Sequence, residues 1–482
     1  MKQPSDDRAL YYRQLRATVA DVFLPELTSP TAIDAAALVD RILSEFIVEE
    51  EDGAAISAEF GAELAHLLHE AVESPVSPEL FHELRRRAVD AVAETAASDD
   101  AVERDRSRQL IDVERRFLER VDEVRQAVLD EEQHVSDDTG LTECSVSAEQ
   151  LTAYLRRRLT GSPGVTVSAM RVVPGGRSKE TILVSLDGTD ELPPDVIVRK
   201  DRPIGVLPTK ASDEFAILRA VYDHGGVPVP EPYFADESPQ ELGDGTLLVM
   251  ARVSGVKAGE YFPDLAAPTA HQRALGEQLA AALAHLHAVP LSSLGSTSLS
   301  LGQEVTEETV AGAVEGMAAR IGQLSGPPIP SVPMARRWLL DHVGDVVPSG
   351  PLCLLQGDVG LHNMLVEGDR LTALVDWEAA TMGPPVRELA AAWPAATALM
   401  AWDDFTDAYG EAGGPAGATD SRGVIFYRLF FALGACMSSR VGGDLFRSGA
   451  KRDLLTAHSG LDAHFRAQRN LARALGEALA TD

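Results

Sequence analysis

Cysteines are scarce in this chain of 482 residues. The three that occur, Cys144, Cys353 and Cys436, are odd in number, widely spaced and without a CxxC pattern. This spacing indicates neither a disulfide framework nor a zinc site. We therefore expect a protein of a reducing compartment, the cytoplasm.

Long apolar runs are also missing. No stretch approaches the roughly 20 apolar residues that a membrane span needs, and the polar N-terminus at 1–8 leads into no apolar signal segment. Hydrophobic residues still make up 45% of the chain, which is enough for buried cores rather than disorder. We expect a globular protein with no membrane partner.

Positive charge is the third shortage, because 43 Lys and Arg face 74 Asp and Glu and give a formal net charge of −31. Nucleic-acid phosphates would be repelled in the absence of a concentrated basic patch, so we expect no nucleic-acid partner. The acidity is uneven, since residues 1–150 hold 15 of the basic and 35 of the acidic residues. The negative charge therefore describes mainly the N-terminal region and says less about a substrate site.

The first 135 residues are predicted to be all helical. They are rich in Ala, Leu, Glu and Arg, and Ser77-Pro78-Glu79 supplies a cap followed by proline at the first helical position. Between 99 and 133, apolar residues recur at steps of three and four and define one stripe of a long amphipathic helix. The stripe needs a cover, either in a self-packed bundle or from the second half of the chain or another chain.

The rest of the chain divides at a polar, acidic segment without periodicity. A capping-box pattern, Ser147 with Gln150, opens a helix after it, and strand-like segments and one further helix follow up to about residue 250. Beyond residue 255 the pattern is mostly helical. We predict four parts: an all-helical domain at 1–135, a linker at 136–146, a sheet-containing lobe at 147–255 and a helical lobe at 256–482.

A group of chemistry-bearing residues lies late in the chain. Asp358 is followed five positions later by Asn363, and Asp376 comes thirteen positions after that. The residues at 364–375 indicate a tight β-hairpin, which would bring Asp376 back beside Asn363. An Asp that accepts a hydroxyl proton, with an Asn and a second Asp that share one Mg²⁺, is the layout of a phosphoryl-transfer centre.

A glycine-rich turn further upstream could meet ATP phosphates. Gly175 and Gly176 allow backbone to approach a ligand closely, and Ser178 adds a hydroxyl. Most Gly-Gly turns are only hairpin turns, so the turn needs support from other residues.

Two cations at the end of an apolar strand, Arg199 and Lys200, offer that support. Strand alternation puts only one of them in a cleft, and the sequence leaves both open, with Arg199 favoured because it follows the apolar run directly. Glu214 on the next helix is the carboxylate expected to pair with the chosen cation. His287 and His362 are expected to pack or to form structural hydrogen bonds rather than to react.

The order and spacing of these segments resemble the aminoglycoside phosphotransferase family of kinase-like enzymes. The amino-acid sequence at 376–383 is most similar to that of the kinase-like domain joined to some acyl-CoA dehydrogenases and of its free-standing bacterial relatives. The resemblance covers residues 147–482. It implies an α+β, two-lobed, protein-kinase-like fold preceded by the all-helical N-terminal domain.

The resemblance also implies an activity, the transfer of the γ-phosphoryl group of ATP, with Mg²⁺, to a hydroxyl of a small molecule. Asp358 would be the base or hydroxyl-positioning residue, and Asn363 and Asp376 would be the Mg²⁺ ligands. The residues implied in ATP binding are Gly175, Gly176, Ser178, Arg199, Lys200, Glu214 and the backbone around Met250 and Arg252. Members of the most similar branch phosphorylate hydroxyacyl-CoA substrates.

The chain departs from the family pattern near the catalytic segment. Gln356 stands where the family usually has His, the segment Gly383-Pro384-Pro385 lacks a common Asp, and Glu388 replaces another. Three functions stay open: a kinase of a hydroxyacyl-CoA or related metabolite, an aminoglycoside or macrolide antibiotic kinase, and a pseudokinase or scaffold. The N-terminal domain lies outside the resemblance and would allow a homodimer or a protein partner.

Overall fold

The computed structural model shows two compact units that are not continuous in sequence. Unit 1 comprises Met1–Thr139, Thr306–Val347 and Ile425–Asp482, and unit 2 comprises Gly140–Val305 and Pro348–Val424. The described residues are 6–481 without 28–29, 73–74, 97, 99, 131–144, 174–178, 202–209, 240–241, 244, 260–268, 296–304, 348–351 and 451–453.

This packing differs from the predicted division into continuous domains. Two segments of the predicted helical lobe, at 306–347 and 425–482, pack with the N-terminal helices. Apart from Ser145 and Val146, the predicted linker at 136–146 lies outside the described residues, so its boundaries stay a prediction.

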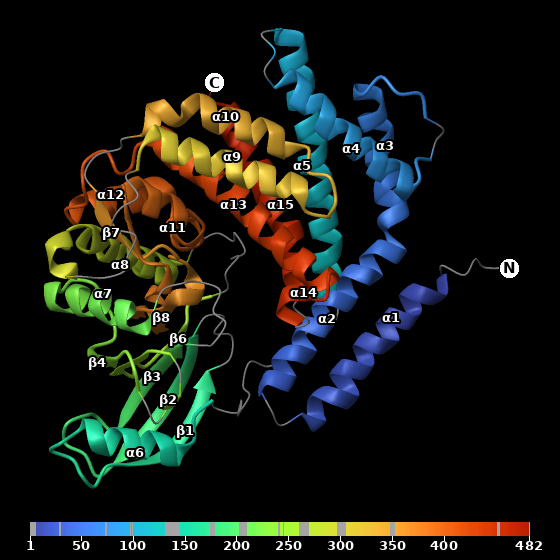
Figure 1. The fold of residues 1–482 in the computed structure, drawn as a ribbon. Coiled ribbons are helices and arrows are strands. Elements are labelled where there is room, and N and C mark those ends of the chain that lie inside the picture. The colour runs from blue at the N-terminus through green and yellow to red at the C-terminus, as the bar shows by residue number, and fades with distance from the viewer. Residues whose placement is uncertain are drawn as a thin grey trace. The chain divides into compact units, whose positions relative to one another are not determined.

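Unit 1 is helical throughout its described part (Figure 1). Its main helices are α1 (Asp6–Thr18), α2 (Pro30–Glu51), α3 (Gly53–Leu67), α4 (Pro78–Thr95), α5 (Ala101–Asp130), α9 (Glu307–Gln323), α10 (Ser331–Val346), most of α13 (Ser421–Arg447), α14 (Leu454–Gly460) and α15 (Asp462–Leu479).

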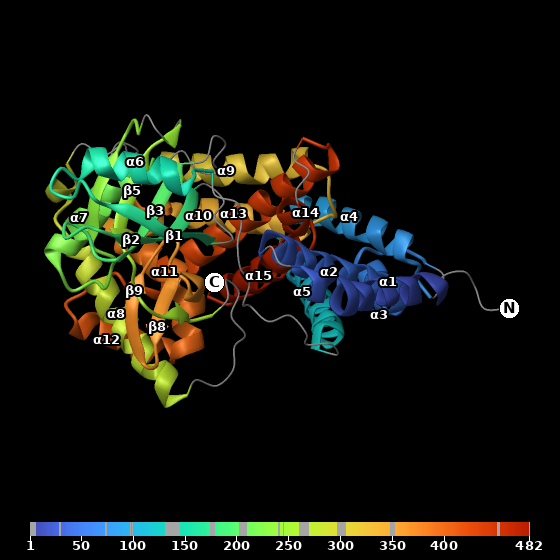
Figure 2. The ribbon, with the colours of Figure 1, turned by 90° about the horizontal axis from the view of Figure 1, so that it is seen from below.

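The apolar stripe of α5 is covered within unit 1. Its residues Leu110, Val113 and Val128 are buried, and the ring of Phe117 packs edge-on against Phe81 of α4 at 4.9 Å between centroids. Helix α15 runs along α5 in Figures 1 and 2, although the two helices are more than 300 positions apart in sequence. The cover therefore comes both from the N-terminal helices and from the last helix of the chain.

Unit 2 contains an antiparallel sheet of five strands in the order β1-β2-β3-β5-β4. The strands are β1 (Thr166–Val173), β2 (Lys179–Asp187), β3 (Asp195–Asp201), β4 (Pro232–Asp236) and β5 (Leu247–Ala251). Strand β4 was not predicted, because it begins with Pro232, and proline lowers the strand signal of what is here an edge strand.

The two faces of this sheet carry different helices. Val196 and Val198 of β3 are buried with α6 (Ala148–Arg158), whereas Ile197 is buried with α7 (Ala211–His224). Because successive side chains of a strand point to opposite faces, Arg199 lies on the α7 face and Lys200 on the α6 face.

The remaining elements of unit 2 include a three-stranded sheet and a separate two-stranded sheet. The strands β8 (Met364–Glu367) and β9 (Arg370–Leu374) form the predicted hairpin, and its turn uses Gly368 with φ 62°. The others are β6 (Val256–Lys257), α8 (Ala270–His287), β7 (Cys353–Leu355), β10 (Thr381–Gly383), α11 (Pro385–Leu399) and α12 (Trp402–Glu411).

One helix among the described residues, α13, is long and apolar enough to cross a membrane by length and composition alone. This finding corrects the expectation that no stretch comes near that length. A core helix passes the same test, and Phe426, Leu429 and Leu433 of α13 are buried in unit 1.

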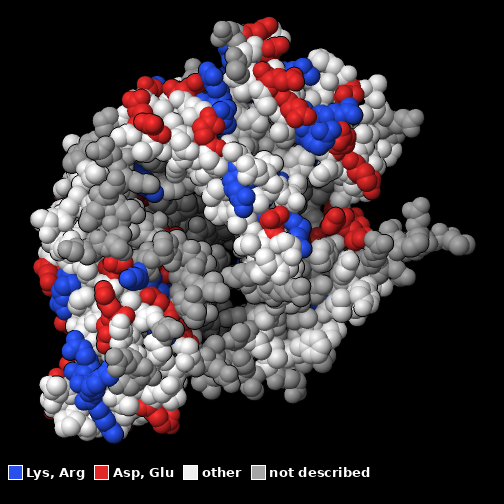
Figure 3. Space-filling view, in the orientation of Figure 1, with Lys and Arg blue, Asp and Glu red and all other residues white. Residues whose placement is uncertain are grey.

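Acidic and basic side chains lie beside one another on the exposed faces of α4 and α5 (Figure 3). Arg86 pairs with Glu83 at 2.6 Å, and Arg116 pairs with Asp112 at 2.9 Å. Exposed pairs of this kind stabilise a helix only slightly, but they break up a field of one sign.

Candidate active site

The segment before Asp358 is tied to the segment around Asp376 by one side chain, that of Gln356. Its Nε2 donates to the backbone oxygens of Val375 at 3.1 Å and Asp376 at 2.9 Å, and its Oε1 accepts from the backbone N–H of Asp358 at 2.7 Å. Gln356 is buried, with 1% of its surface exposed. A single amide group therefore fixes the two predicted catalytic segments relative to each other.

Glu388 of α11 holds the same segment from the other side. Its carboxylate accepts from the backbone N–H groups of Gln356 and of Gly357, the latter at 3.0 Å. Burial raises the pKa of Glu388 to about 7, although the two N–H groups lower it in part. Gly357 has φ 84°, and a Cβ there would lie 2.2 Å from the oxygen of Ala379, so only glycine fits.

Asp358 presents a partly exposed carboxylate, with 38% of its side chain accessible. The Nδ2 of Asn363 donates to the backbone oxygen and to Oδ2 of Asp358, both at 2.9 Å. His362 Nε2 lies 3.3 Å from the same Oδ2, so this histidine is a hydrogen-bond neighbour of the carboxylate. His287 is buried, and its Nδ1 lies 2.7 Å from the hydroxyl of Tyr409.

The hairpin brings Asp376 back to Asn363, because the N–H of Val375 donates to the backbone oxygen of Asn363 at 3.0 Å. Asp376 has a left-handed backbone, φ 63° and ψ 70°, which Asp adopts more readily than most residues other than glycine. Its side chain is 39% exposed. The placement puts a carboxylate and an amide side chain on adjoining backbone.

These two side chains offer oxygen atoms of the kind that would suit a magnesium ion. Asn363 uses its nitrogen on Asp358, so its oxygen Oδ1 remains as the ligand atom, and Asp376 adds a carboxylate. The described residues contain no group of three or more His, Cys, Asp or Glu that could hold a metal. Mg²⁺ at a nucleotide site does not need one, because it binds one or two side-chain oxygens, phosphate oxygens and water.

Arg199 lies at the centre of a charge cluster in unit 2. Its Nη1 is 2.8 Å from Glu214, and its Nη2 is 2.9 Å from Asp376 and 3.6 Å from Glu378. The predicted pair of Arg199 and Glu214 is therefore brought together by β3 and α7. Its role in nucleotide binding stays a prediction.

Lys179 is the second cation of the charge cluster, and the sequence interpretation missed it together with Glu378. Its Nζ lies 3.4 Å from Glu378 and 4.0 Å from Glu214, and only 1% of the residue is exposed. Lys179 stood in the predicted glycine-rich turn, whereas the structure makes it the first residue of β2. The only signal in the sequence was the step of two from Lys179 to Thr181, which places both on one strand face.

The electrostatics of the charge cluster are dominated by burial and by an excess of carboxylates. Burial alone would lower the pKa of Arg199, but Glu214 and Asp376 outweigh it and raise that pKa. Burial raises the pKa of Glu214, and Arg199 and Lys179 oppose it only in part. Within the described part of the chain, neither buried oxygen of Glu214 accepts a hydrogen bond of good geometry, so its contacts are ion pairs.

Other predicted site residues are not in the charge cluster. Lys200 is buried on the α6 face, where it lies opposite Glu180 in the strand register. Arg252 is half exposed and lies 3.7 Å from Asp195. The side chain of Met250 is buried in the core. Three further predicted residues, Gly175, Gly176 and Ser178, lie outside the described residues.

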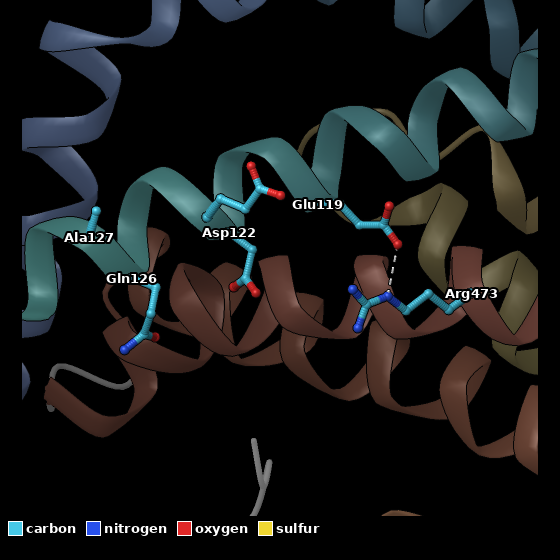
Figure 4. A pocket seen from close by; sticks show the side chains of 6 residues that line it. Glu119, Asp122, Gln126, Ala127 and Arg473 are labelled. Atoms are coloured by element: carbon cyan, nitrogen blue, oxygen red, sulfur yellow. Dashed lines mark hydrogen bonds and ion pairs between the residues drawn. The ribbon is translucent and has the colours of Figure 1, made fainter. Parts of the chain in front are cut away.

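A cavity of about 630 Å³ lies in unit 1, between α5 and α15 (Figure 4). Its carboxylates are already paired: Glu119 accepts from Arg473 at 3.0 Å, and Asp122 accepts from Arg125 at 2.6 Å. None of its lining residues was predicted to react. The predicted catalytic residues Asp358, Asn363 and Asp376 belong to unit 2 and do not line this cavity.

Two sequence relatives of the chain share a name. Acyl-CoA dehydrogenase family member 11 of Rattus norvegicus is 28% identical over 249 residues, which are 50% of this chain and 30% of the relative. The Homo sapiens protein of that name is 25% identical over 252 residues, with the same shares. The chain thus spans under a third of the length of these relatives.

Among solved structures, a Ralstonia eutropha protein proposed to be an aminoglycoside phosphotransferase has a TM-score of 0.52 at 18% identity. The match covers 70% of this chain and 98% of that one. At this identity the likeness concerns the fold, and it confirms the predicted kinase-like α+β fold. The predicted helices before this fold are present as α1 to α5.

Residues 169–424, more than half of the chain, match the phosphotransferase enzyme family. This match includes the charge cluster and the segments of Asp358, Asn363 and Asp376. The resemblance found in the sequence is confirmed, and the chain belongs to the phosphotransferase enzyme family.

Proposed function

We propose that this chain transfers the γ-phosphoryl group of ATP, bound with Mg²⁺, to a hydroxyl of a small molecule. The observation that carries the proposal is the fixed grouping of Asp358, Asn363 and Asp376. Asn363 holds the carboxylate of Asp358, and Gln356 joins the backbone of Asp358 to that of Asp376.

In this reaction Asp358 would position the acceptor hydroxyl and take its proton. The hydroxyl oxygen forms a bond to the γ-phosphorus, the bond from that phosphorus to the β-phosphate oxygen breaks, and ADP leaves. Asn363 and Asp376 would hold the Mg²⁺, which neutralises charge on the phosphates when bound. Most of the rate enhancement would come from positioning and from charge neutralisation.

Gln356 bears on the pseudokinase alternative, because a residue that departs from the family pattern beside the catalytic segment favours an inactive protein. The side chain makes three hydrogen bonds that fix the two catalytic segments. A substituted residue that still holds the segments in place favours an enzyme over a scaffold.

We infer that the acceptor is a hydroxyacyl-CoA or a related metabolite, which the similarity to acyl-CoA dehydrogenase family member 11 supports. An aminoglycoside or macrolide kinase is the rival, supported by what the Ralstonia eutropha protein is proposed to be. A cytoplasmic location, and a homodimer or protein partner bound through the N-terminal helices, also stay proposals.

The variant Asp358→Asn tests the proposal. It should fold, bind Mg·ATP within about threefold of the unaltered protein, and lose turnover by about 10²–10⁴-fold. Asp369→Asn is the matched control, since Asp369 is an exposed carboxylate in the β8–β9 turn. Equal turnover by Asp358→Asn and the unaltered protein would contradict the assignment.

The acceptor is identified by incubating the protein with Mg·ATP and a panel of hydroxyacyl-CoAs, aminoglycosides and macrolides. Mass spectrometry then shows which compound gains one phosphoryl group. Phosphorylation of a hydroxyacyl-CoA supports our acceptor. Phosphorylation of an antibiotic alone selects the rival, and no product together with no ATP binding selects the scaffold.

A further inference from the structure

We propose that Lys179, and neither Arg199 nor Lys200, is the cation that contacts the terminal phosphates of the nucleotide. Arg199 is then a positioning residue that holds Glu214 and Asp376. This assignment rests on the proposed function of the site and reverses the preference for Arg199 drawn from the sequence.

Both Nη groups of Arg199 already contact carboxylates. Nη1 contacts Glu214, and Nη2 contacts Asp376 and Glu378. The remaining nitrogen, Nε, is buried and has no hydrogen-bond partner in the described part of the chain. The guanidinium is planar and its donors point in fixed directions, and both of its Nη groups already face carboxylates, which leaves fewer of its five N–H donors for a phosphate.

Lys179 lies farther from its nearest carboxylates in the charge cluster than Arg199 does. Its distances of 3.4 Å to Glu378 and 4.0 Å to Glu214 exceed the 2.7–2.9 Å usual for a charged N–H···O bond. An ammonium group on a flexible stem can turn toward a new anion while it stays near its carboxylates. Because Lys179 is almost fully buried, its ammonium group has lost most of its bound water. Phosphate oxygens would take the place of that water.

The strand register places Lys179 correctly and excludes Lys200. Thr181, two positions after Lys179 in β2, lies opposite Arg199, so Lys179 and Arg199 share the α7 face of the sheet. Lys200 lies opposite Glu180 on the α6 face. Glu180 also accepts a hydrogen bond from the backbone N–H of Ser145 at 2.9 Å. Glu180 and Lys200 therefore lie on the face of the sheet opposite to Lys179 and Arg199.

Lys179 also offsets part of the negative charge of the cluster. With all groups ionised, Lys179 and Arg199 face three carboxylates, those of Glu214, Asp376 and Glu378. Removing Lys179 leaves one cation against three anions, which disfavours any phosphate placed nearby. The loss should therefore weaken the binding of ATP and of ADP, which carry phosphates beside Lys179, and leave the binding of adenosine almost unchanged.

The first experiment measures dissociation constants for Mg·ATP, Mg·ADP and adenosine by calorimetry. Lys179→Gln should bind ATP and ADP about 10–100-fold more weakly, as expected for a lost hydrogen bond to a charged group, and adenosine within about twofold. Arg171→Gln, which removes an exposed cation from β1 of the same sheet, is the matched control and should stay within about twofold for all three.

Unchanged ATP binding by Lys179→Gln, or a selective loss in Lys200→Gln instead, overturns the assignment. The proposed function is judged separately by the unaltered protein. If that protein binds no Mg·ATP, both proposals are wrong. If it binds Mg·ATP and Lys179→Gln binds equally well, only the role of Lys179 is wrong.

The role of Arg199 is tested by Arg199→Lys, which keeps the charge but lacks the two separate nitrogens that reach Glu214 and Asp376. We expect turnover to fall by about tenfold or more while the ATP dissociation constant stays within about threefold. The reverse result, weak ATP binding with unchanged turnover, would make Arg199 the phosphate contact and contradict the assignment.

A second measurement needs no variant and so does not depend on whether Lys179→Gln folds. An ATP analogue with an acyl group on its terminal phosphate transfers that group to a lysine amine beside the phosphate, and the nucleotide leaves. Peptide mass spectrometry should find the acyl group on Lys179, with protection by excess ATP. Acylation of Lys200 alone, or no acylation while the analogue is bound, overturns the assignment.

Discussion

Each unit contains a buried Arg–Glu pair, and the two pairs differ in how well their charges are satisfied. In unit 1, Glu114 accepts from the backbone N–H of Ser331 at 2.9 Å and from its hydroxyl at 2.7 Å, and Arg85 lies 3.4 Å away. In unit 2, Glu214 is fully buried but has only ion-pair contacts in the described part of the chain.

The pKa values of the two arginines are also shifted in opposite directions. Burial lowers the pKa of Arg85, and the single carboxylate of Glu114 does not compensate fully. Burial acts on Arg199 too, but Glu214, Asp376 and Glu378 together raise its pKa. Three carboxylates around two buried cations are typical of a binding or reaction centre, whereas a buried pair whose carboxylate accepts hydrogen bonds is typical of the packing between helices.

The largest expected difference between the pairs is in stability. Glu114→Gln should lower the free energy of unfolding of unit 1 by about 3–5 kcal/mol, because Arg85 loses its only nearby carboxylate among the described residues. Glu214→Gln should lower that of unit 2 by less than about 1 kcal/mol, because Arg199 keeps Asp376 and Glu378.

Hydrogen exchange of α5 and α10 for unit 1, and of α7 and β3 for unit 2, measures these losses separately. Glu214→Gln should lower turnover despite its small effect on stability. Equal destabilisation by the two variants would remove the distinction between a structural and a functional pair.

Glu388 sharpens the comparison through pH, because it is a buried carboxylate of unit 2 that does accept two backbone hydrogen bonds. Its pKa of about 7 in the folded chain lies above the ordinary value of 4.5. Between these pH values the folded state holds a proton that the unfolded state has lost, so stability falls as pH rises through this window. The expected fall is up to about 3 kcal/mol.

Chemical denaturation of the unaltered protein and of Glu388→Gln at pH 4.5, 6 and 8 measures this contribution. The variant should lose this part of the pH dependence while the contributions of other groups remain. A pH dependence of the same size in both proteins would show that Glu388 has an ordinary pKa in the folded state.

The sequence allowed those parts of the fold and site to be predicted that depend on nearby residues. Asn363 and Asp376 are joined by a hairpin whose turn, around Gly368, is visible in the sequence, and Glu214 follows Arg199 on the next helix. Lys179 could not be found, because its place beside Arg199 depends on the register of β2 on β3. Periodicity also cannot tell which distant amphipathic helices pack together, so the pairing of α15 with α5 was not predicted.

The smallest expected effect concerns Gln356, whose side chain makes three hydrogen bonds beside the charge cluster. Gln356 uses two donor hydrogens and one acceptor, whereas a neutral histidine offers one of each, so Gln356→His should lose about one hydrogen bond, worth roughly 1 kcal/mol. Turnover of Gln356→His should fall by no more than about tenfold. Turnover of Gln356→Leu, which removes all three hydrogen bonds, should fall much further. If Gln356→His instead raised turnover steeply, Gln356 would be a loss-of-function replacement, and the charge cluster would belong to an enzyme that no longer works at full rate.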